Sequence, residues 1–270
     1  MKDKNRTNPS VAPILRGKKF AAPSVFTPES LLREARRQKQ LAAGTVPEVC
    51  ILDPDGDIVR HLSAADRARR DREWACYHTE LYLFEYEGAR FGIVGCAVGA
   101  AFAVLVAEEL FASGCKLLIS MTSAGQLLPI QTPPYFILIE RALRDEGTSY
   151  HYVAPDEYSA ADATLVQKTK ASLAATGVPM QTGATWTTDA PFRETADAVE
   201  QAKLSGLLAV EMEAAALYAF ATARSKSVLC FAHVTNQMGR IEGDFEKGVS
   251  DGAQASLKVI ATAAKAYQQE

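Results

Sequence analysis

The sequence predicts a single α/β domain in which helices flank a central β-sheet. Short apolar segments of strand length alternate with helical segments, and residues 91–120 form one strand–helix–strand passage. The chain of 270 residues, with 48% hydrophobic and 23% charged residues, is long enough for one large domain. We find no internal repeat, low-complexity tract or convincing linker that would divide it.

The N-terminal residues are expected to lie outside this domain. Residues 1–25 are polar, basic and interrupted by prolines, which predicts a flexible arm ahead of a domain over residues 26–270. Thr27, Pro28 and Glu29 then combine a helix N-cap, a first-turn proline and an acidic first turn. They predict a helix over residues 29–40.

The remaining elements follow in chain order. Strands are expected at residues 49–52, 82–86, 91–95, 116–120, 136–139 and 228–234. Helices are expected at residues 62–72, 100–112, 160–175 and 256–267. The last of these strands is apolar throughout, which is typical of a strand covered on both faces.

Composition excludes several classes of function. The net charge of −3 gives no indication of a nucleic-acid partner. No apolar run approaches the roughly 18 residues that cross a bilayer, and no apolar segment follows the basic N-terminus, so we expect neither a membrane span nor a secretory signal. Five scattered cysteines fit buried free thiols in a reducing cytosol, and a cytoplasmic protein is expected. Neither these nor the four histidines have zinc-ligand spacing, so no metal site is expected.

Two acidic residues interrupt an apolar, helix-forming run at residues 208–220. The carboxylates of Glu211 and Glu213 are costly to desolvate and therefore need partners. They could stabilise a helix N-terminus, where free N–H groups favour negative charge. Alternatively, one of them receives a ligand with hydroxyl donors, such as a sugar, while the other meets solvent or a backbone donor.

Polar and glycine-rich turns follow four of the predicted strands, and ligands in open α/β sheets gather at such strand ends. These turns are residues 55–60, 95–99, 121–125 and 235–238. Their backbone N–H groups and hydroxyls could bind an anion, although turns use the same residue types for geometry alone. No P-loop, dinucleotide-binding glycine motif or serine-hydrolase elbow is present.

A further candidate site lies at residues 183–194. Trp186 and Phe192 offer flat surfaces on which a flat ligand can stack, and Arg193 offers a planar set of donors. The alternative is a core tryptophan and a surface ion pair between Arg193 and Glu194.

Taken in this order, the motifs resemble the nucleoside phosphorylase superfamily, on the side of uridine phosphorylases and hexameric purine nucleoside phosphorylases. The resemblance runs from about residue 49 to the C-terminus. Residues 210–216 (Val-Glu-Met-Glu-Ala-Ala-Ala) are similar to the family's ribose-binding segment. The resemblance implies that Glu213 holds the ribose 2′- and 3′-hydroxyls, that Met212 packs on the sugar, and that Glu211 supports both.

The resemblance also carries implications for the whole molecule. It implies a mixed, partly barrel-like sheet and phosphate-dependent cleavage of a ribonucleoside, with inorganic phosphate as co-substrate and no cofactor. It further implies a homo-oligomer built from dimers, as a hexamer.

Several residues are implied at the phosphate. Residues 56–60 (Gly-Asp-Ile-Val-Arg) resemble the family's phosphate loop, with isoleucine where proline is usual, so the Gly56 N–H and Arg60 are expected to bind phosphate. Arg72 resembles the arginine that reaches the phosphate of the adjacent subunit. Ser123 falls where a phosphate-binding serine or threonine stands.

Residues 185–195 resemble the base-pocket loop of some uridine phosphorylase-like members, which implies that Trp186, Phe192 and Arg193 line the base site. Asn236 stands where the family places a base-contacting aspartate or asparagine. Its amide both donates and accepts, which suits a 6-oxopurine or a uracil. The resemblance thus implies Glu213 as the catalytic residue at the sugar, with Asn236 and Arg193 acting on the departing base.

The chain departs from the family at one turn. Ser120 stands where phosphorylases usually carry a phosphate-binding arginine, and Thr122 replaces a glycine, so residues 120–125 are closer to the turn of nucleosidases. Losing an arginine–phosphate contact could cost about 2–3 kcal/mol unless another cation replaces it. The candidates for that cation are Arg60, Arg72, Arg33 and Lys247. Phosphorolysis, hydrolysis by water, and nucleoside binding without catalysis all stay open.

Overall fold

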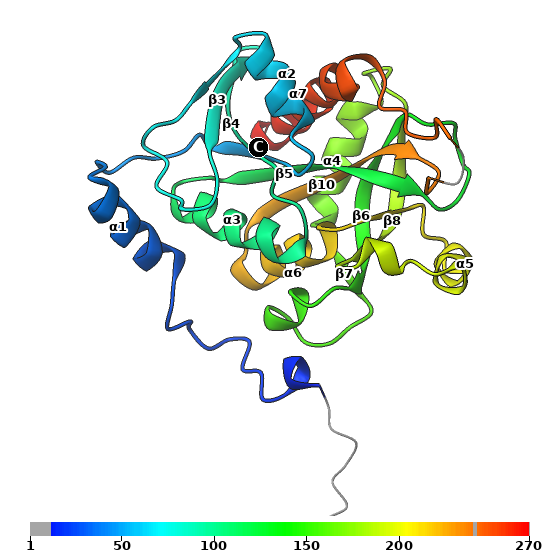
Figure 1. Ribbon diagram of the computed structural model, residues 1–270, viewed down its shortest axis with the longest axis horizontal. Coiled ribbons are helices and arrows are strands. Elements are labelled where there is room, and N and C mark those ends of the chain that lie inside the picture. Colours follow the sequence, from blue (N-terminus) through cyan, green and yellow to red (C-terminus); the bar gives the residue numbers. More distant parts are fainter. Residues whose placement is uncertain (1–11, 240–241, 270) are drawn as a thin grey trace, which may run out of the picture.

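A mixed β-sheet lies at the centre of the computed structural model, which describes residues 12–239 and 242–269 (Figure 1). The strands are β1 (Val49–Asp53), β2 (Ala68–Arg70), β3 (Leu81–Tyr86), β4 (Ala89–Gly95), β5 (Leu117–Gln126), β6 (Tyr135–Asp145), β7 (Tyr158–Ala160), β8 (Met180–Thr188), β9 (Ala209–Glu211) and β10 (Ser227–Asn236). The α-helices are α1 (Pro28–Lys39), α2 (Asp57–Ala64), α3 (Ala100–Ala112), α4 (Ala163–Leu173), α5 (Ala196–Leu204), α6 (Ala214–Arg224) and α7 (Ala253–Gln268). Short 3-10 helices are η1 (Pro13–Leu15), η2 (Ser149–His151), η3 (Pro191–Arg193) and η4 (Val249–Gly252).

Part of the sheet closes on itself. The pairing order runs β10-β6-β8-β9-β5, and β10 also pairs with β5, so these five strands form a closed ring. From β5 the order continues through β1, β4 and β3 to β2 as an open sheet. The pairs β1–β5 and β5–β10 are parallel, whereas β10–β6 is antiparallel. The predicted mixed, partly barrel-like sheet is therefore confirmed.

Helices cover the sheet on two sides. The packed residues of α3 and α6 form one apolar cluster with the sheet, and those of α2, α4 and α7 contribute to another. β5 and β10 are buried along most of their length because each lies between these layers. Their carboxyl ends, together with that of β1, carry the turns that concern function.

The predicted helix over residues 62–72 is wrong. Helix α2 begins at Asp57, directly after Gly56, and ends at Ala64. Asp66 adopts a left-handed backbone (φ 53°), and the Arg67 N–H turns back to the Leu62 carbonyl, which terminates the helix. Residues 68–70 are instead strand β2, paired with β3. The charged residues at 66–72 resemble an exposed helical face in composition alone.

Four further elements were not predicted, namely β7, β8, β9 and α5. β8 and β9 complete the closed ring, and α5 lies between them in sequence. β8 is rich in threonine and carries no continuous apolar run, so its sequence resembles that of a polar loop. The helices expected over residues 29–40, 100–112, 160–175 and 256–267 correspond to α1, α3, α4 and α7.

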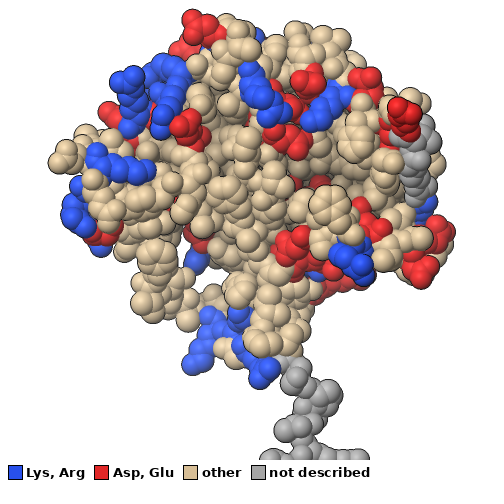
Figure 2. All heavy atoms as spheres, in the orientation of Figure 1, with Lys and Arg blue, Asp and Glu red and all other residues tan. Residues whose placement is uncertain are grey.

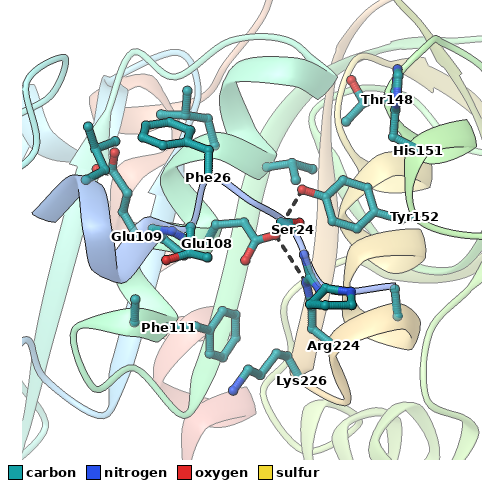
Figure 3. A pocket seen from close by; sticks show the side chains of 18 of the residues that line it. Ser24, Phe26, Glu108, Glu109, Phe111, Thr148, His151, Tyr152, Arg224 and Lys226 are labelled. Carbon is teal, nitrogen blue, oxygen red and sulfur yellow. Dashed lines mark hydrogen bonds and ion pairs between the residues drawn. The ribbon is translucent and has the colours of Figure 1, made fainter. Parts of the chain in front are cut away.

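The segment before α1 stands apart from the rest of the chain. Residues 19–26 are all exposed, and a hollow of about 1020 Å³ lies between this segment, α3 and α6 (Figure 3). In its wall, Glu108 accepts a hydrogen bond from the Tyr152 hydroxyl (3.0 Å) and pairs with Arg224 (3.3 Å). Residues 1–11 of the expected flexible arm lie outside the described residues, and its boundary at residue 25 stays a prediction. No helix in the described ranges is long and apolar enough to span a bilayer.

Candidate functional site

The passage from β9 into α6 places both acidic residues of the apolar run. Glu211 is the last residue of β9, and Glu213 is the N-cap residue of α6. The alanines that follow favour the helix and pack into the apolar cluster of α3 and α6. Both side chains are buried, with exposed fractions of 3% for Glu211 and 1% for Glu213.

Glu211 is satisfied by donors within the chain. Its carboxylate accepts the N–H groups of Glu213 and Ala214, each at 2.7 Å. It also accepts the hydroxyls of Thr185 (3.1 Å) and Thr187 on β8. Burial raises the pKa of Glu211, and these hydrogen bonds oppose that rise. Glu211 therefore uses the free N–H groups at the start of α6 and fixes the turn that presents Glu213.

Glu213 joins three segments of the chain. Its Oε1 accepts the N–H of Gly99, between β4 and α3, at 2.7 Å, and its Oε2 accepts the hydroxyl of Thr122, on β5, at 2.8 Å. The N–H of Met212 lies 3.3 Å from Oε2, and the Met212 side chain is half-buried. No lysine or arginine among the described residues forms an ion pair with Glu213.

The protonation of Glu213 follows from this environment. Burial raises its pKa to about 7, and the neighbouring charge of Glu211 adds to the rise. Hydrogen bonds from Gly99 and Thr122 act in the opposite direction. The ionised side chain is an acceptor without a counter-charge, so hydroxyl donors of a bound molecule would be strong partners for it.

The turn between β1 and α2 holds the residues expected at the phosphate. Gly56 adopts φ +74°, and a Cβ there would lie 2.8 Å from the Cys96 Sγ, so the turn requires glycine. Its N–H already donates to the Asp53 carbonyl at 2.8 Å. Arg60 donates to the Asp55 carbonyl (2.8 Å) and pairs with the Asp57 carboxylate. The groups expected to bind phosphate, the Gly56 N–H and the Arg60 side chain, are thus present, and each has a partner within the chain.

Ser123, on β5, and Lys247, in the segment between β10 and η4, reach the same turn. The Lys247 Nζ lies 2.5 Å from the Asp57 Oδ2 and 3.7 Å from the Asp55 Oδ2. The Ser123 hydroxyl, on β5, donates to the Asp55 carboxylate. Burial raises the pKa of Asp55 and raises that of Asp53 to about 7. Two cations and a hydroxyl therefore converge on carboxylates at the end of β1.

The predicted base residues are not brought together in the chain. Trp186 is 5% exposed, packs with an apolar cluster and donates its Nε1–H to Asp145 at 3.0 Å. This matches the interpretation of Trp186 as a core residue. Phe192 is 100% exposed and Arg193 is exposed. The alternative surface ion pair with Glu194 does not form in the part of the chain that the structure describes.

Asn236 lies at the end of β10, 8% exposed. Its Oδ1 accepts the Met238 N–H at 2.9 Å, and its Nδ2 donates to the Thr235 hydroxyl at 3.1 Å. A Cβ on Gly125 would lie 3.3 Å from the Asn236 Oδ1 and 3.4 Å from Val210. The amide is therefore close to the strand that leads to Glu211.

Comparison with known proteins identifies the family. The sequence profile described as the phosphorylase superfamily matches residues 48–267. The chain belongs to this superfamily. It is 27% identical to the uridine phosphorylase of Thermococcus kodakarensis over 240 residues, which cover 81% of this chain and 84% of the relative. It is 28% identical to the purine nucleoside phosphorylase of Plasmodium vivax over 247 residues, covering 86% and 98%.

Two further comparisons agree with this assignment. The guanosine phosphorylase of Halorubrum lacusprofundi is 25% identical over 215 residues, covering 78% of this chain and 85% of the relative. The crystal structure of uridine phosphorylase from Vibrio fischeri ES114 superposes with a TM-score of 0.67 at 20% identity, covering 86% of this chain and 94% of that chain. The superfamily therefore accounts for the closed ring of strands and the helices that flank it.

Within the superfamily domain, some site residues were missed by sequence analysis. Gly99 and Thr122 were not predicted as partners of Glu213, and Asp55 was not predicted as the acceptor for Ser123. The available signal was positional, because all three lie in or beside the polar turns after strands. Arg72 is exposed and has no hydrogen-bond or ion-pair partner among residues 12–239 and 242–269. Its expected contact with a neighbouring subunit stays a prediction.

The surface charge of the superfamily domain is mixed. Basic and acidic side chains alternate across the face that Figure 2 shows, with no large area of one sign. This distribution gives no indication of a nucleic-acid surface. Among the described residues, no group of three or more His, Cys, Asp or Glu side chains could hold a metal ion.

Proposed function

We propose that the protein is a nucleoside phosphorylase that cleaves the N-glycosidic bond of a ribonucleoside with inorganic phosphate. The products are the free base and ribose 1-phosphate. The observation that carries the proposal is the buried carboxylate of Glu213, which has N–H and hydroxyl donors and, in the described part of the chain, no paired cation. Relatives of the chain are phosphorylases of uridine, guanosine and purine nucleosides, and we propose uridine or a 6-oxopurine nucleoside as substrate.

In this mechanism Glu213 accepts the ribose 2′- and 3′-hydroxyls, and Met212 packs on the sugar. The bond from C1′ to the base nitrogen breaks and its electron pair leaves with the base. Asn236 or Arg193 stabilises the resulting negative charge on the base. A phosphate oxygen then bonds to C1′ of the oxocarbenium-like ribose. The negative charges of Glu213 and of phosphate stabilise the positive charge that develops on the sugar. Positioning of the two substrates supplies much of the rate, because no covalent intermediate forms on the protein.

The anion side of the site supports the same proposal. Gly56, Arg60 and Ser123 lie at the turn after β1 or beside it, where they would hold phosphate. Arg72 of a neighbouring subunit would complete this shell, and we propose a homo-oligomer built from dimers, as a hexamer. We place the enzyme in the cytoplasm and assign it no cofactor beyond phosphate as co-substrate.

Hydrolysis is the second candidate, and one observation favours it. Asp55 accepts the Ser123 hydroxyl at the place proposed for phosphate, and Arg60 and Lys247 are paired with carboxylates. A carboxylate with a raised pKa beside a serine could take a proton from an attacking water. The products would then be free base and ribose.

The deciding experiment measures base release from uridine, inosine, guanosine and adenosine, with and without phosphate. Phosphorolysis requires a rate that depends on phosphate and yields ribose 1-phosphate in equal amount with the base. An undiminished rate without phosphate, with free ribose as product, would establish hydrolysis instead. No cleavage, together with nucleoside-induced thermal stabilisation, would leave a non-catalytic nucleoside-binding protein.

A further inference from the structure

We propose that Lys247 is the principal cation that binds the phosphate co-substrate, and that Asp55 and Asp57 hold its side chain in place until phosphate enters. This inference rests on the proposed phosphorolysis. It assigns phosphate binding to the segment between β10 and α7 in addition to the turn after β1.

The backbone around Lys247 fixes where its side chain begins. The N–H of Glu246 donates to the Thr235 carbonyl on β10 at 2.7 Å, which returns the chain to the end of that strand. Gly248 adopts φ +82° and donates its N–H to the Glu246 Oε1 at 2.7 Å. A residue held between these two hydrogen bonds has a defined direction, and the Lys247 side chain runs from there to Asp57.

The side chain of Lys247 reaches a cluster of two carboxylates, Asp55 and Asp57, which Arg60 and Ser123 also contact. Its Nζ lies 2.5 Å from Asp57 and 3.7 Å from Asp55, while Arg60 pairs with the same Asp57 and Ser123 donates to the same Asp55. A tetrahedral dianion presents several acceptor oxygens to such an arrangement. On binding phosphate, each donor would exchange its carboxylate partner for a phosphate oxygen.

Burial distinguishes Lys247 from the other available cations. Its side chain is 28% exposed, compared with 61% for Arg60 and 69% for Arg33. Arg33 is engaged with its neighbour Glu34 on α1, and Arg72 is exposed. A less solvated charge interacts more strongly with an anion, so Lys247 contributes the largest attraction per contact.

Neither Ser120 nor His233, which lie on the neighbouring strands, supplies a positive charge that could replace that of Lys247. Ser120 is completely buried and its hydroxyl has no hydrogen-bond partner among the residues that the structure describes, so β5 provides no cation at that position. His233 on β10 is buried and stacks on Phe136 at 4.6 Å between ring centroids. Burial lowers the pKa of His233 to about 4, and this histidine is therefore neutral at physiological pH. Among the described residues, Lys247 is the cation that pairs with the carboxylates at this side of the site.

The test compares Lys247→Met and Lys247→Arg with the unaltered enzyme in steady-state kinetics that vary phosphate and nucleoside separately. We expect Lys247→Met to raise KM for phosphate by about 10- to 100-fold, the effect of losing one charge-assisted contact, with KM for nucleoside within about twofold. Lys247→Arg should restore most of the loss. The matched control is Lys258→Met, because Lys258 lies on α7 and donates only to the Thr176 carbonyl.

Binding measurements make the test independent of turnover. Titration with inorganic phosphate alone, followed by calorimetry and by thermal unfolding, should show weaker binding for Lys247→Met and near-normal binding for Lys247→Arg. If Lys247→Met does not fold, Lys247→Gln keeps a donor without the charge and is expected to show the same loss. An unchanged phosphate affinity and KM in a folded, charge-free variant would overturn the assignment of Lys247 while the phosphate dependence of the unaltered enzyme still stood. A rate that never depended on phosphate would overturn both proposals.

Discussion

The two halves of the candidate site differ in how their charges are compensated. On the sugar side, Glu213 is buried and its partners among residues 12–239 and 242–269 are N–H and hydroxyl donors, so its charge is available to a ligand. On the anion side, Arg60 and Lys247 are already paired with carboxylates, and Ser123 is bonded to Asp55. The sugar side is therefore preorganised, whereas the anion side must exchange one set of partners for another when its ligand binds.

The strongest way to break this comparison is to remove the charge of Glu213. Glu213→Gln keeps the shape of the side chain but replaces the charged carboxylate, the proposed acceptor for two ribose hydroxyls, with a neutral amide. We expect kcat/KM to fall by about 1,000-fold or more while the far-ultraviolet circular dichroism stays native. Glu200→Gln, on exposed α5, is the control for loss of one negative charge. Near-normal turnover in Glu213→Gln would refute the assignment of the sugar side.

The pH dependence of kcat/KM tests the same carboxylate without a substitution. Because burial raises the pKa of Glu213 to about 7, the free enzyme gains its ionised form only as the pH rises through that value. We expect kcat/KM for nucleoside to decrease by about fivefold between pH 7 and pH 6 and to level off above pH 8, provided the ionised form binds the sugar. A flat profile between pH 5.5 and 8 would contradict this.

Stability should follow the opposite trend with pH. Glu213 and Asp53 both have pKa values raised to about 7 by burial, above the ordinary values of 4.5 and 3.8. Their protonated forms are favoured in the folded state, so this contribution is complete below the ordinary values and is lost as pH rises through about 7. Urea unfolding at pH 5 to 8 should show it, and Asp53→Asn should reduce the slope.

Asp55→Asn sharpens the comparison on the anion side. Removing a negative charge beside the proposed phosphate reduces repulsion, and we expect KM for phosphate to fall by about three- to tenfold. Glu87→Gln removes the same charge at the remote, exposed Lys265 pair and serves as the control. If Asp55 instead activates water, the variant would lose its phosphate-independent rate, and phosphate would have no effect on either protein.

The smallest effect is expected at Ser120. Its hydroxyl is buried without a partner, so Ser120→Ala removes a desolvated group and leaves no donor or acceptor behind. We expect the free energy of unfolding to stay within about 0.5 kcal/mol or to increase, and KM for phosphate to be unchanged. A large rise in KM for phosphate would show that this hydroxyl acts on the anion side after all.

The sequence indicated the buried acidic residues more clearly than their partners, for a physical reason. An ionisable residue inside an apolar run is visible as a local conflict, which is how Glu211 and Glu213 were found. The partners of Glu213 are not local, because Gly99 and Thr122 are separated from it by 114 and 91 residues. Lys247 was one of four candidate cations, and its contacts with Asp55 and Asp57 and its lower exposure distinguish it in the structure.

In the fold, too, elements with a local sequence pattern were predicted, whereas elements that depend on distant contacts or on a single backbone conformation were not. Apolar strands such as β1 and β10 can be predicted from a few consecutive apolar residues. The strand–helix–strand passage from β4 to β5 was also predicted correctly. Helix α2 was misplaced because its end depends on one left-handed residue, Asp66, that propensity does not mark. Strand β8 was missed because its threonines are stabilised by contacts from other strands, including the hydrogen bonds to Glu211.

Closure of the ring also determines which backbone groups remain free for other chains. With β5 and β10 paired to each other, the pairing order ends in β2, and β7 is attached alone to β6. Both are only three residues long, and β2 carries Arg69 and Arg70. Such short, partly basic margins are poor templates for an incoming strand, so the molecule is protected against edge-to-edge aggregation. Subunits that associate would therefore meet through helices and loops, leaving the strands intact.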